Sequence, residues 1–310
     1  MDLTLIICTY KRGKSIDQTL NALQGQLPSS TKWQLLIVDN ADDIETQQVA
    51  KKYHDTLPVE LIIEKKPGQN SARNAAIPHI KGELVVFTDD DITPKENWLQ
   101  SLLTAAQHHP EADVFGGRII PVWPDKGTPW QADAWFSNFV YADQDLGDED
   151  LEYKEGCYPS SPNMAIRKKI FDQGITFNDK IGPIGKNRIS GSESEFLSRV
   201  LQDRKGLYIA DSKVLHRITA NMMTRKYLRK RCYAMGLGMS VWNASPSNER
   251  NLPQIFGVPR YRIGRIATES LKAFWYQLTF DNTKASEAEC AALLDLGFCI
   301  GIWKNLKSSI

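Results

Sequence analysis

The chain has 310 residues, 42% of them hydrophobic and 24% charged, with a formal net charge of +1 at pH 7. This length suits one large domain, or a domain with a smaller unit appended to it. The near-neutral net charge excludes long-range charge attraction as the main way of binding a partner, and it argues against a nucleic-acid-binding protein. None of the five cysteines shows Cys-x-x-Cys spacing. We therefore expect neither a disulfide framework nor a cysteine zinc site, and a reducing, cytoplasmic compartment.

Neither a signal peptide nor a membrane-spanning helix is expected. The first residues, MDLTLIICTY, have no basic stretch ahead of their apolar run and lead directly into the charged KRGK. They indicate a first strand. The most apolar late stretch, 291–303, is shorter than the ~18 residues a membrane span needs and contains Asp295. At most, peripheral contact with the inner face of a membrane is expected.

Strand-like and helix-like segments alternate through the first hundred residues. Nearly continuous apolar, β-branched runs are typical of strands buried on both faces, and they occupy residues 3–9, 33–39, 59–64 and 83–89. Segments of helical length and polarity follow them at residues 14–26, 42–54, 69–80 and 95–108. The pattern predicts a parallel sheet with right-handed helical crossovers. A ligand of such a sheet is expected beyond the carboxyl ends of its strands.

The second half is less regular. Residues 121–155 form a long acidic segment with Pro and Trp, which is typical of a lid or binding loop. A helix is predicted at 192–203. From residue 224 onward the pattern is helical, with a Pro-, Gly- and Ser-rich break at 245–259.

The strand at 83–89 delivers three consecutive carboxylates, Asp89, Asp90 and Asp91. In an extended chain Asp89 and Asp91 face the same side, and their repulsion is relieved by a cation. Oxygen ligands favour Mg²⁺ or Mn²⁺ held jointly with substrate phosphates. The alternative is a carboxylate that caps the helix beginning near Pro94, but capping uses only one of the three.

Neither G-x-G-x-x-G after the first strand nor G-x-x-x-x-G-K-[ST] occurs, which disfavours dinucleotide and P-loop sites. Four other motifs follow one another: IICTYKR, LLIVDNAD, KPGQNSARNAA and GELVVFTDDDI. In this order, over about residues 3–218, they resemble the nucleotide-sugar-dependent family-2 glycosyltransferases of the GT-A fold. The resemblance implies an α/β, Rossmann-like, mostly parallel sheet flanked by helices. Its domain would span 1–220, with a nucleotide-binding half at 1–118 and an acceptor half at 119–220, followed by a helical C-terminal extension at 221–310.

The resemblance also assigns the nucleotide site, position by position, to Thr9, Tyr10, Arg12, Asp39, Asn40, Arg73, Asp89 and Asp90. An Asp39 acceptor suits an imide N–H of the base, and many relatives have a second Asp in place of Asn40. The donor fork of Arg73 suits phosphate, although a surface helix arginine explains it about as well.

The metal site implied by the resemblance contains Asp91, with His216 near the metal or the diphosphate. A lone histidine after a strand is more often a packed structural residue. For the catalytic base the run GSESEF aligns with the acidic motif of the family and gives Glu193. Ser190 and Ser192 each begin a capping-box spacing, so Glu195 remains the alternative base. Ser192 stands where an acid is usual.

The function implied is an inverting transfer from a nucleotide-sugar, with a UDP-sugar preferred, to a glycan or lipid-linked acceptor hydroxyl, with Mn²⁺ or Mg²⁺. The Q-x-x-R-W run of processive synthases is absent, which predicts a non-processive enzyme. The basic cluster at 225–231 is a candidate for peripheral membrane contact, and a solvated helix face explains it equally well. Two other classes stay open, a catalytically silent nucleotide-sugar- or glycan-binding module and a metal-dependent nucleotidyltransferase.

Overall fold

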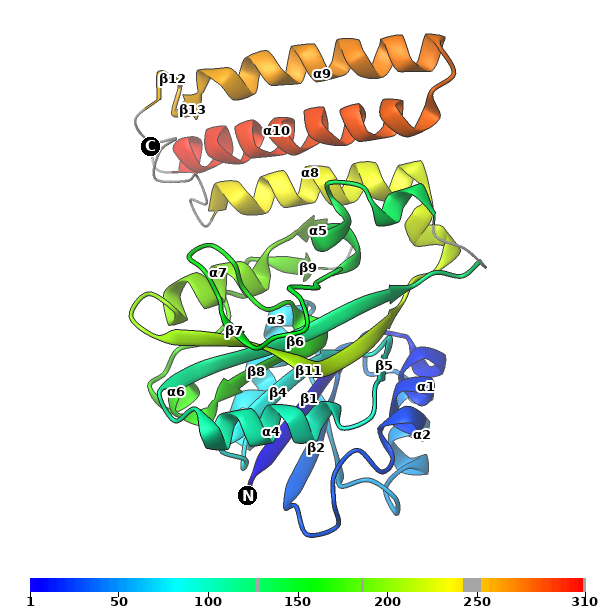
Figure 1. Cartoon of the computed structure of the whole chain (residues 1–310), viewed down its shortest axis with the longest axis vertical. Coiled ribbons are helices and arrows are strands. Elements are labelled where there is room, and N and C mark those ends of the chain that lie inside the picture. The colour runs from blue at the N-terminus through cyan, green and yellow to red at the C-terminus, as the bar shows by residue number, and fades with distance from the viewer. Residues whose placement is uncertain (126–128, 185–186, 242–251, 309–310) are drawn as a thin grey trace. The chain divides into compact units, whose positions relative to one another are not determined.

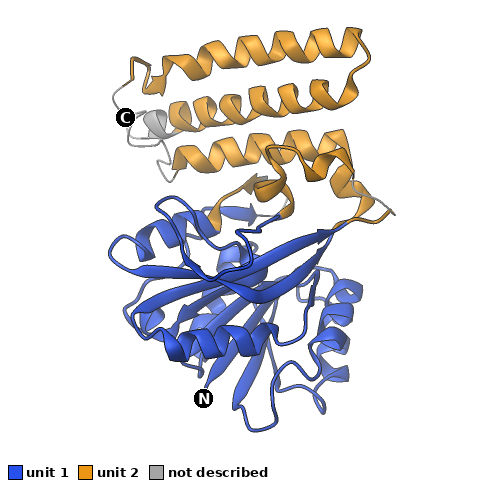
Figure 2. Ribbon diagram, viewed as in Figure 1, with its two compact units in different colours: residues 1–122, 142–185, 193–217 blue, residues 123–141, 186–192, 218–310 orange. Residues whose placement is uncertain are grey.

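The computed structural model describes residues 1–125, 129–184, 187–241 and 252–308 (Figure 1). Contacts group the chain into two compact units (Figure 2). Unit 1 comprises 1–122, 142–185 and 193–217, and unit 2 comprises 123–141, 186–192 and 218–310. The last boundary between the two units, between residues 217 and 218, lies close to residue 220, where the sequence predicted the end of the first domain. The segments 123–141 and 186–192, however, group with the helical unit and not with the acceptor half where the sequence placed them.

A mixed, mostly parallel sheet forms the centre of unit 1, which confirms the predicted fold class. Its strand order is β3-β2-β1-β4-β8-β6-β11-β5, with β7 beside β11. The first four strands are mutually parallel, and β8 is antiparallel to both its neighbours. The strands are β1 (Leu3–Thr9), β2 (Trp33–Asp39), β3 (Val59–Ile63), β4 (Leu84–Asp89), β5 (Ile92–Pro94), β6 (Ala112–Val122), β7 (Leu151–Glu152), β8 (Met164–Arg167) and β11 (Lys205–Arg217). A short strand β9 (Gly182–Ile184) lies outside this order.

Helices cover both faces of this sheet. Because side chains alternate along β1, Leu3, Leu5 and Ile7 pack in one core with α1 and α4, whereas Ile6 packs in a second core with α3, α6 and α7. The helices are α1 (Gly13–Leu23), α2 (Ile44–Lys52), α3 (Gln69–Ala76), α4 (Trp98–His108), α6 (Lys168–Asp172) and α7 (Ser192–Val200), with 3₁₀ turns η1 (Ile77–His79) and η3 (Ser161–Asn163).

Strand register brings three strand ends together at one edge of the sheet. Thr9 pairs with Asp39 across β1 and β2, and Cys8 pairs with Asp89 across β1 and β4. The carboxyl ends of β1, β2 and β4 therefore lie side by side, where the topology rule places ligands.

Unit 2 contains a layer of three long helices in which α10 lies between α8 and α9 (Figure 1). The backbones of α8 and α10 approach closely, because a Cβ built on Gly236 would lie 1.9 Å from the Leu294 carbonyl oxygen. The elements are α5 (Ser137–Tyr141), α8 (Arg225–Val241), α9 (Arg260–Leu278), α10 (Asn282–Ser308), η2 (Trp130–Ala132), η4 (Ala220–Met223), β10 (Asn187–Ile189), β12 (Gln254–Ile255) and β13 (Val258–Pro259). The helical extension is thus confirmed.

Two predicted irregular segments are covered only in part. Residues 126–128 of the 121–155 segment and residues 245–251 of the 245–259 break lie outside the described residues. No helix in the described part of the chain combines the length and apolar composition that a membrane span requires.

Candidate active site

Arg12 joins the end of β1 to the carboxylates that follow β4. Its Nη1 lies 2.8 Å from Asp90 Oδ1, and its Nη2 lies 2.8 Å from Asp91 Oδ2. Thr9 Oγ1 donates a hydrogen bond of 2.6 Å to Asp90 Oδ2. One guanidinium therefore bridges two neighbouring, almost fully buried acids, and Thr9 at the end of β1 is bonded to Asp90.

Asp89 faces different partners from Asp90 and Asp91. Strand β4 ends at Asp89, and Asp90 and Asp91 form a turn before β5, so side-chain alternation does not continue through them. Asp89 Oδ1 accepts a hydrogen bond of 2.8 Å from Ser161 Oγ. The expected pairing of Asp89 with Asp91 around one cation is thus replaced by Asp90 and Asp91 around Arg12.

The pKa values of the three carboxyl groups are not shifted alike. Burial and, secondarily, the negative charge of Asp91 raise the pKa of Asp89. Burial raises the pKa of Asp90 to about 7, although Arg12 opposes the shift. Burial acts in the same direction on Asp91, but His216 and Arg12 outweigh it and hold the pKa of Asp91 well below its usual range. Asp91 is therefore the most firmly ionised of the three.

Asp91 and His216 suit a divalent cation. The Oδ1 atom of Asp91 is buried and has no hydrogen-bond partner among the described residues. It lies 3.5 Å from Nε2 of His216, which is carried by β11. No group of three or more His, Cys, Asp or Glu side chains is arranged for a metal within the described ranges. An ion held here would take its remaining ligands from a substrate, as Mg²⁺ and Mn²⁺ commonly do with phosphates.

Arg73 lies in a buried network on the other side of Asp89. Its Nη2 is 2.6 Å from Glu193 Oε1 and donates a second bond of 2.6 Å to Ser161 Oγ, the hydroxyl that itself donates to Asp89. Its Nη1 donates to Asn70 Oδ1 at 3.0 Å. The side chain is only 2% exposed, so the alternative of a surface arginine is excluded. Arg73 thus contacts Glu193, and its predicted place near the nucleotide or its phosphates stays a prediction.

Ser161 was not among the residues singled out from the sequence. It begins the short η3 turn, and the segment Ser-Pro-Asn signals only a turn. Its hydroxyl nevertheless links Asp89 to Arg73, and through Arg73 to Glu193, over separations of 72 and 88 residues. Such a link requires the tertiary fold.

Glu193 and Glu195 point to different neighbours. Glu193 meets Arg73 and retains 21% side-chain exposure. Glu195 is bound by Arg199 one turn later on the same helix, with Nε to Oε1 at 2.8 Å and Nη2 to Oε2 at 3.1 Å. The two acids that the sequence left as alternatives therefore differ. Glu193 is linked through Arg73 to the end of β4, and Glu195 is paired with Arg199 on its own helix.

Asp39 and Asn40 organise the loops at the end of β2. Asp39 is fully buried, and its two oxygens accept the backbone N–H groups of Ala41 and Asp43 at 2.9 and 2.7 Å. Asn40 Nδ2 donates to the carbonyls of Glu64 and Lys66, while its Oδ1 accepts from the backbone of Gly68. Of the residues predicted to line the nucleotide, Tyr10 is the most open, with 50% exposure.

The family is decided by a match over the first half of the chain. The sequence model of Glycosyl transferase family 2 matches residues 4–175, which is more than half of the 310 residues. The chain belongs to glycosyl transferase family 2. The matched part of this family-2 chain includes Thr9, Arg12, residues 89–91, Arg73 and Ser161, whereas Glu193 and His216 lie beyond it.

Known relatives agree with this family. The chain is 26% identical over 200 residues to glycosyltransferase AglE of Haloferax volcanii, a match that covers 64% of this chain and 60% of that protein. In fold it is similar to residues 1–349 of S. aureus TarS in complex with UDP-GlcNAc, with a TM-score of 0.52, 15% identity and coverage of 97% and 92% of the two chains. It is also similar to the mannosyltransferase PcManGT of Pyrobaculum calidifontis in complex with GDP-Man and Mn²⁺, with a TM-score of 0.59, 14% identity and coverage of 95% and 86%.

Proposed function

We propose that the chain is an inverting, non-processive glycosyltransferase that moves a sugar from a nucleotide-sugar, preferably a UDP-sugar, to a hydroxyl of a glycan or lipid-linked acceptor. One observation carries the proposal. The Glu193 carboxylate is connected through Arg73 and Ser161 to Asp89, next to the Asp91 carboxylate that suits a cation. A candidate proton acceptor is thus linked by hydrogen bonds to Asp89, two residues before the carboxylate assigned to the cation.

Glu193 is assigned the role of general base. Inversion requires a group that takes the proton of the acceptor hydroxyl while the nucleoside diphosphate leaves from the opposite face of the sugar. Glu193 combines partial exposure with a fixed orientation, since Arg73 holds Oε1 at 2.6 Å. An ion pair favours the charged form of a carboxylate, which is the form that accepts a proton. Arg73 is therefore assigned as the residue that positions the base.

The diphosphate is assigned to the cluster around Arg12. A bound Mn²⁺ or Mg²⁺, held by Asp91 and His216, supplies charge neutralisation for the leaving diphosphate. Arg12 is 41% exposed, and its planar fork of donors matches phosphate oxygens, so it can contact both the acids and a ligand. The Mn²⁺ of the mannosyltransferase and the UDP-GlcNAc of TarS support a metal and a UDP-sugar for this chain.

Tyr10 is assigned to the nucleotide, on which its exposed ring can stack. The five cysteines are all free, which supports a reducing compartment such as the cytoplasm. We also propose peripheral membrane contact through the exposed part of the basic cluster at 225–231. The silent module and the nucleotidyltransferase become outcomes of the following experiment.

The decisive experiment measures nucleoside diphosphate release from UDP-, GDP- and dTDP-sugars with and without Mn²⁺, in the wild type, Asp91→Ala and Glu193→Gln. Metal-dependent release of one diphosphate that is lost in Asp91→Ala and reduced in Glu193→Gln supports the proposal. Donor binding without release, even when glycan and lipid-linked acceptors are present, would show a binding module. Pyrophosphate formation from a nucleoside triphosphate and a sugar phosphate would show a nucleotidyltransferase.

A further inference from the structure

Helix α9 exposes an unusual amount of apolar surface along its C-terminal half. The exposed fractions are 68% for Leu271, 61% for Phe274, 63% for Trp275 and 58% for Leu278, and Phe280 just beyond the helix is 87% exposed. We call these five residues the apolar ridge. Monomeric proteins rarely leave so many large apolar side chains together in water, so a contiguous patch of this kind marks an interaction surface.

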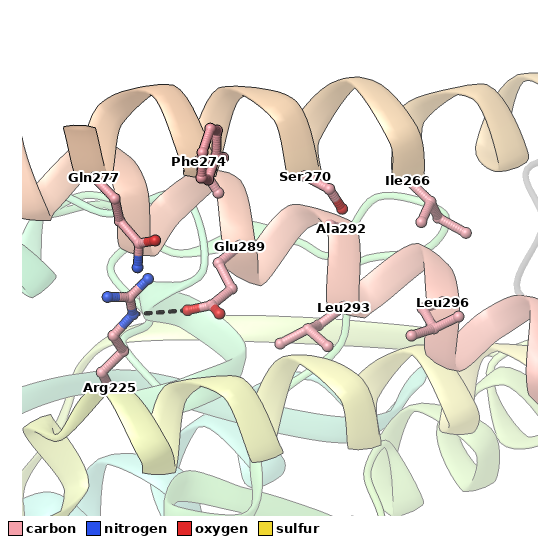
Figure 3. A pocket seen from close by; sticks show the side chains of 10 residues that line it. Arg225, Ile266, Ser270, Phe274, Gln277, Glu289, Ala292, Leu293 and Leu296 are labelled. Carbon is pink, nitrogen blue, oxygen red and sulfur yellow. Dashed lines mark hydrogen bonds and ion pairs between the residues drawn. The ribbon is translucent and has the colours of Figure 1, made fainter. Parts of the chain in front are cut away.

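A groove continues from this ridge between α9 and α10 (Figure 3). Its volume is about 250 Å³, and Phe274 belongs both to the ridge and to the groove wall. Most of the lining is apolar, from Ile266 and Ala273 on α9 to Leu293 and Leu296 on α10. One end is polar, where Arg225 binds Glu289 at 2.7 Å. The ridge is therefore continuous with an apolar trough that ends at an arginine.

Charge is distributed unevenly between the two parts of the chain. Residues 221–310 contain thirteen Lys and Arg against six Asp and Glu, a formal net charge of +7, whereas residues 1–220 carry −6. The basic start of α8 and the apolar half of α9 lie at the same end of the helical layer (Figure 1). A basic helical layer with an exposed apolar edge has the composition of a surface that docks on anionic lipid.

The predicted basic cluster at 225–231 is only partly available for such contact. Arg225 and Arg229 both pair with Glu289, at 2.7 and 3.3 Å, and Arg231 donates to the Phe139 carbonyl at 2.6 Å. These three arginines bind within unit 2 and tie α8 to its neighbours. Exposed lysines flank the ridge at Lys272 on α9 and at Lys284, whose Nζ lies 5.7 Å from the centroid of the Tyr276 ring, and both also pair with acids, Glu269 and Asp281. Lys226 and Lys230 are exposed on α8.

We propose that unit 2 docks on an anionic phospholipid bilayer through the apolar ridge, with the exposed lysines around it contacting lipid headgroups. The ridge combines Trp and Phe with flanking Lys, the composition typical of membrane–water interfaces. A second copy of the chain fits less well, because two surfaces of the same strongly positive unit would face each other. The proposal is independent of the reaction proposed above, since vesicle binding needs neither donor nor metal.

The test is co-sedimentation of the full chain with vesicles of phosphatidylcholine alone and of phosphatidylcholine with phosphatidylglycerol. Binding should require phosphatidylglycerol, weaken severalfold at high salt, and fall by about tenfold in the double variant Leu271→Ser/Trp275→Ser. Ile44→Ser, at an equally exposed apolar residue on α2, is the matched control and should bind like the wild type. Brominated acyl chains should quench tryptophan fluorescence in the wild type and less in Trp275→Phe.

Three outcomes would overturn the proposal. The first is no binding to anionic vesicles, and the second is equal binding by the double variant and the wild type. The third is a stable dimer in sedimentation velocity that the double variant converts to monomer, which would show that a second copy covers the ridge. Donor hydrolysis without vesicles should be the same in the double variant and the wild type, so that a failure of docking is distinguished from a failure of the catalytic proposal.

Discussion

Arg73 on α3 holds Glu193 on α7 at 2.6 Å, across 120 residues of sequence. Because the arginine is 2% exposed and also binds Ser161, its orientation is fixed from two sides. The ion pair joins two elements that pack in the same core below the sheet edge.

Removal of Arg73 should therefore destabilise the fold and also free Glu193 from its fixed orientation. For Arg73→Met we expect a loss of about 3 kcal/mol in the free energy of unfolding, because a buried carboxylate network loses its cation. The matched control is Arg199→Met, which removes the exposed partner of Glu195 and should cost about 0.5 kcal/mol. Urea denaturation followed by circular dichroism measures both. Equal losses in the two variants would contradict the assignment of Arg73 as a buried positioning residue.

Glu193→Gln should reduce kcat of sugar transfer by about 10²- to 10⁴-fold with little change in donor KM, since a general base acts in the chemical step. Glu195→Gln is the control on the same helix, and its kcat should stay close to that of the wild type because Arg199 binds this carboxylate. Steady-state kinetics with the donor identified by the hydrolysis panel measures the difference. The reverse order of effects would make Glu195 the base.

Arg12 and a divalent cation should compete for Asp91. The Arg12→Ala variant leaves Asp90 and Asp91 without the guanidinium that now bridges them. We expect Mn²⁺ to bind this variant more tightly in the absence of donor. Arg12 relieves the repulsion between the Asp90 and Asp91 carboxylates in the wild type, and in the variant only the metal can relieve it. Electron paramagnetic resonance of free Mn²⁺ measures this affinity without any turnover. Unchanged affinity in Arg12→Ala, together with lost affinity in Asp91→Ala, would show that Arg12 and the ion do not share the acid.

Asn40→Asp should destabilise the chain although many family members are expected to carry an acid there. The amide of Asn40 donates to the carbonyls of Glu64 and Lys66, and a carboxylate in its place would have no N–H to donate to either oxygen. We expect a loss of about 2 to 3 kcal/mol, the usual effect of unsatisfied buried polar groups. Thermal unfolding monitored by calorimetry tests this. A variant as stable as the wild type would indicate that the loop at Gly68 repacks around the acid.

Cysteine reactivity offers a test of the fold in its native state. Cys157 is exposed, whereas Cys232, Cys290 and Cys299 are buried, and burial raises the pKa of Cys8 to about 12. Iodoacetamide at pH 8 should therefore modify one thiol in the native protein and five in urea, because the thiolate is the reactive form. Mass spectrometry counts the labels, and Cys157→Ser should remove native labelling. Rapid native modification of a second cysteine would contradict this burial pattern.

Local patterns were sufficient to predict the strands that end at Thr9, Asp39 and Asp89, because continuous β-branched runs and their polar ends are readable from neighbouring residues. They could not predict how the acids divide among partners. The turn at Asp90 and Asp91 ends the alternation on which the expected pairing of Asp89 with Asp91 depended. The roles of Arg73 and Ser161 depend on contacts 120 and 72 residues away, and no local signal marks such contacts.

The exposure of the apolar ridge could not be predicted from the sequence either. The sequence predicts a helical pattern from residue 224 onward, but it does not say which face of α9 meets α10 and which meets solvent. The buried ion pair of Arg262 with Asp295 fixes that choice in the structure. As a result, Leu271 and Trp275 are left exposed.

The position of α10 in the middle of the helical layer has a consequence for biosynthesis. A ribosome delivers α8 and α9 before α10, yet each of them packs on α10. Arg262 also has to wait for Asp295, because the acid that it binds is made 33 residues later. The layer therefore forms after α10 has emerged from the exit tunnel, and until then the nascent chain holds α8 and α9 without the helix that joins them.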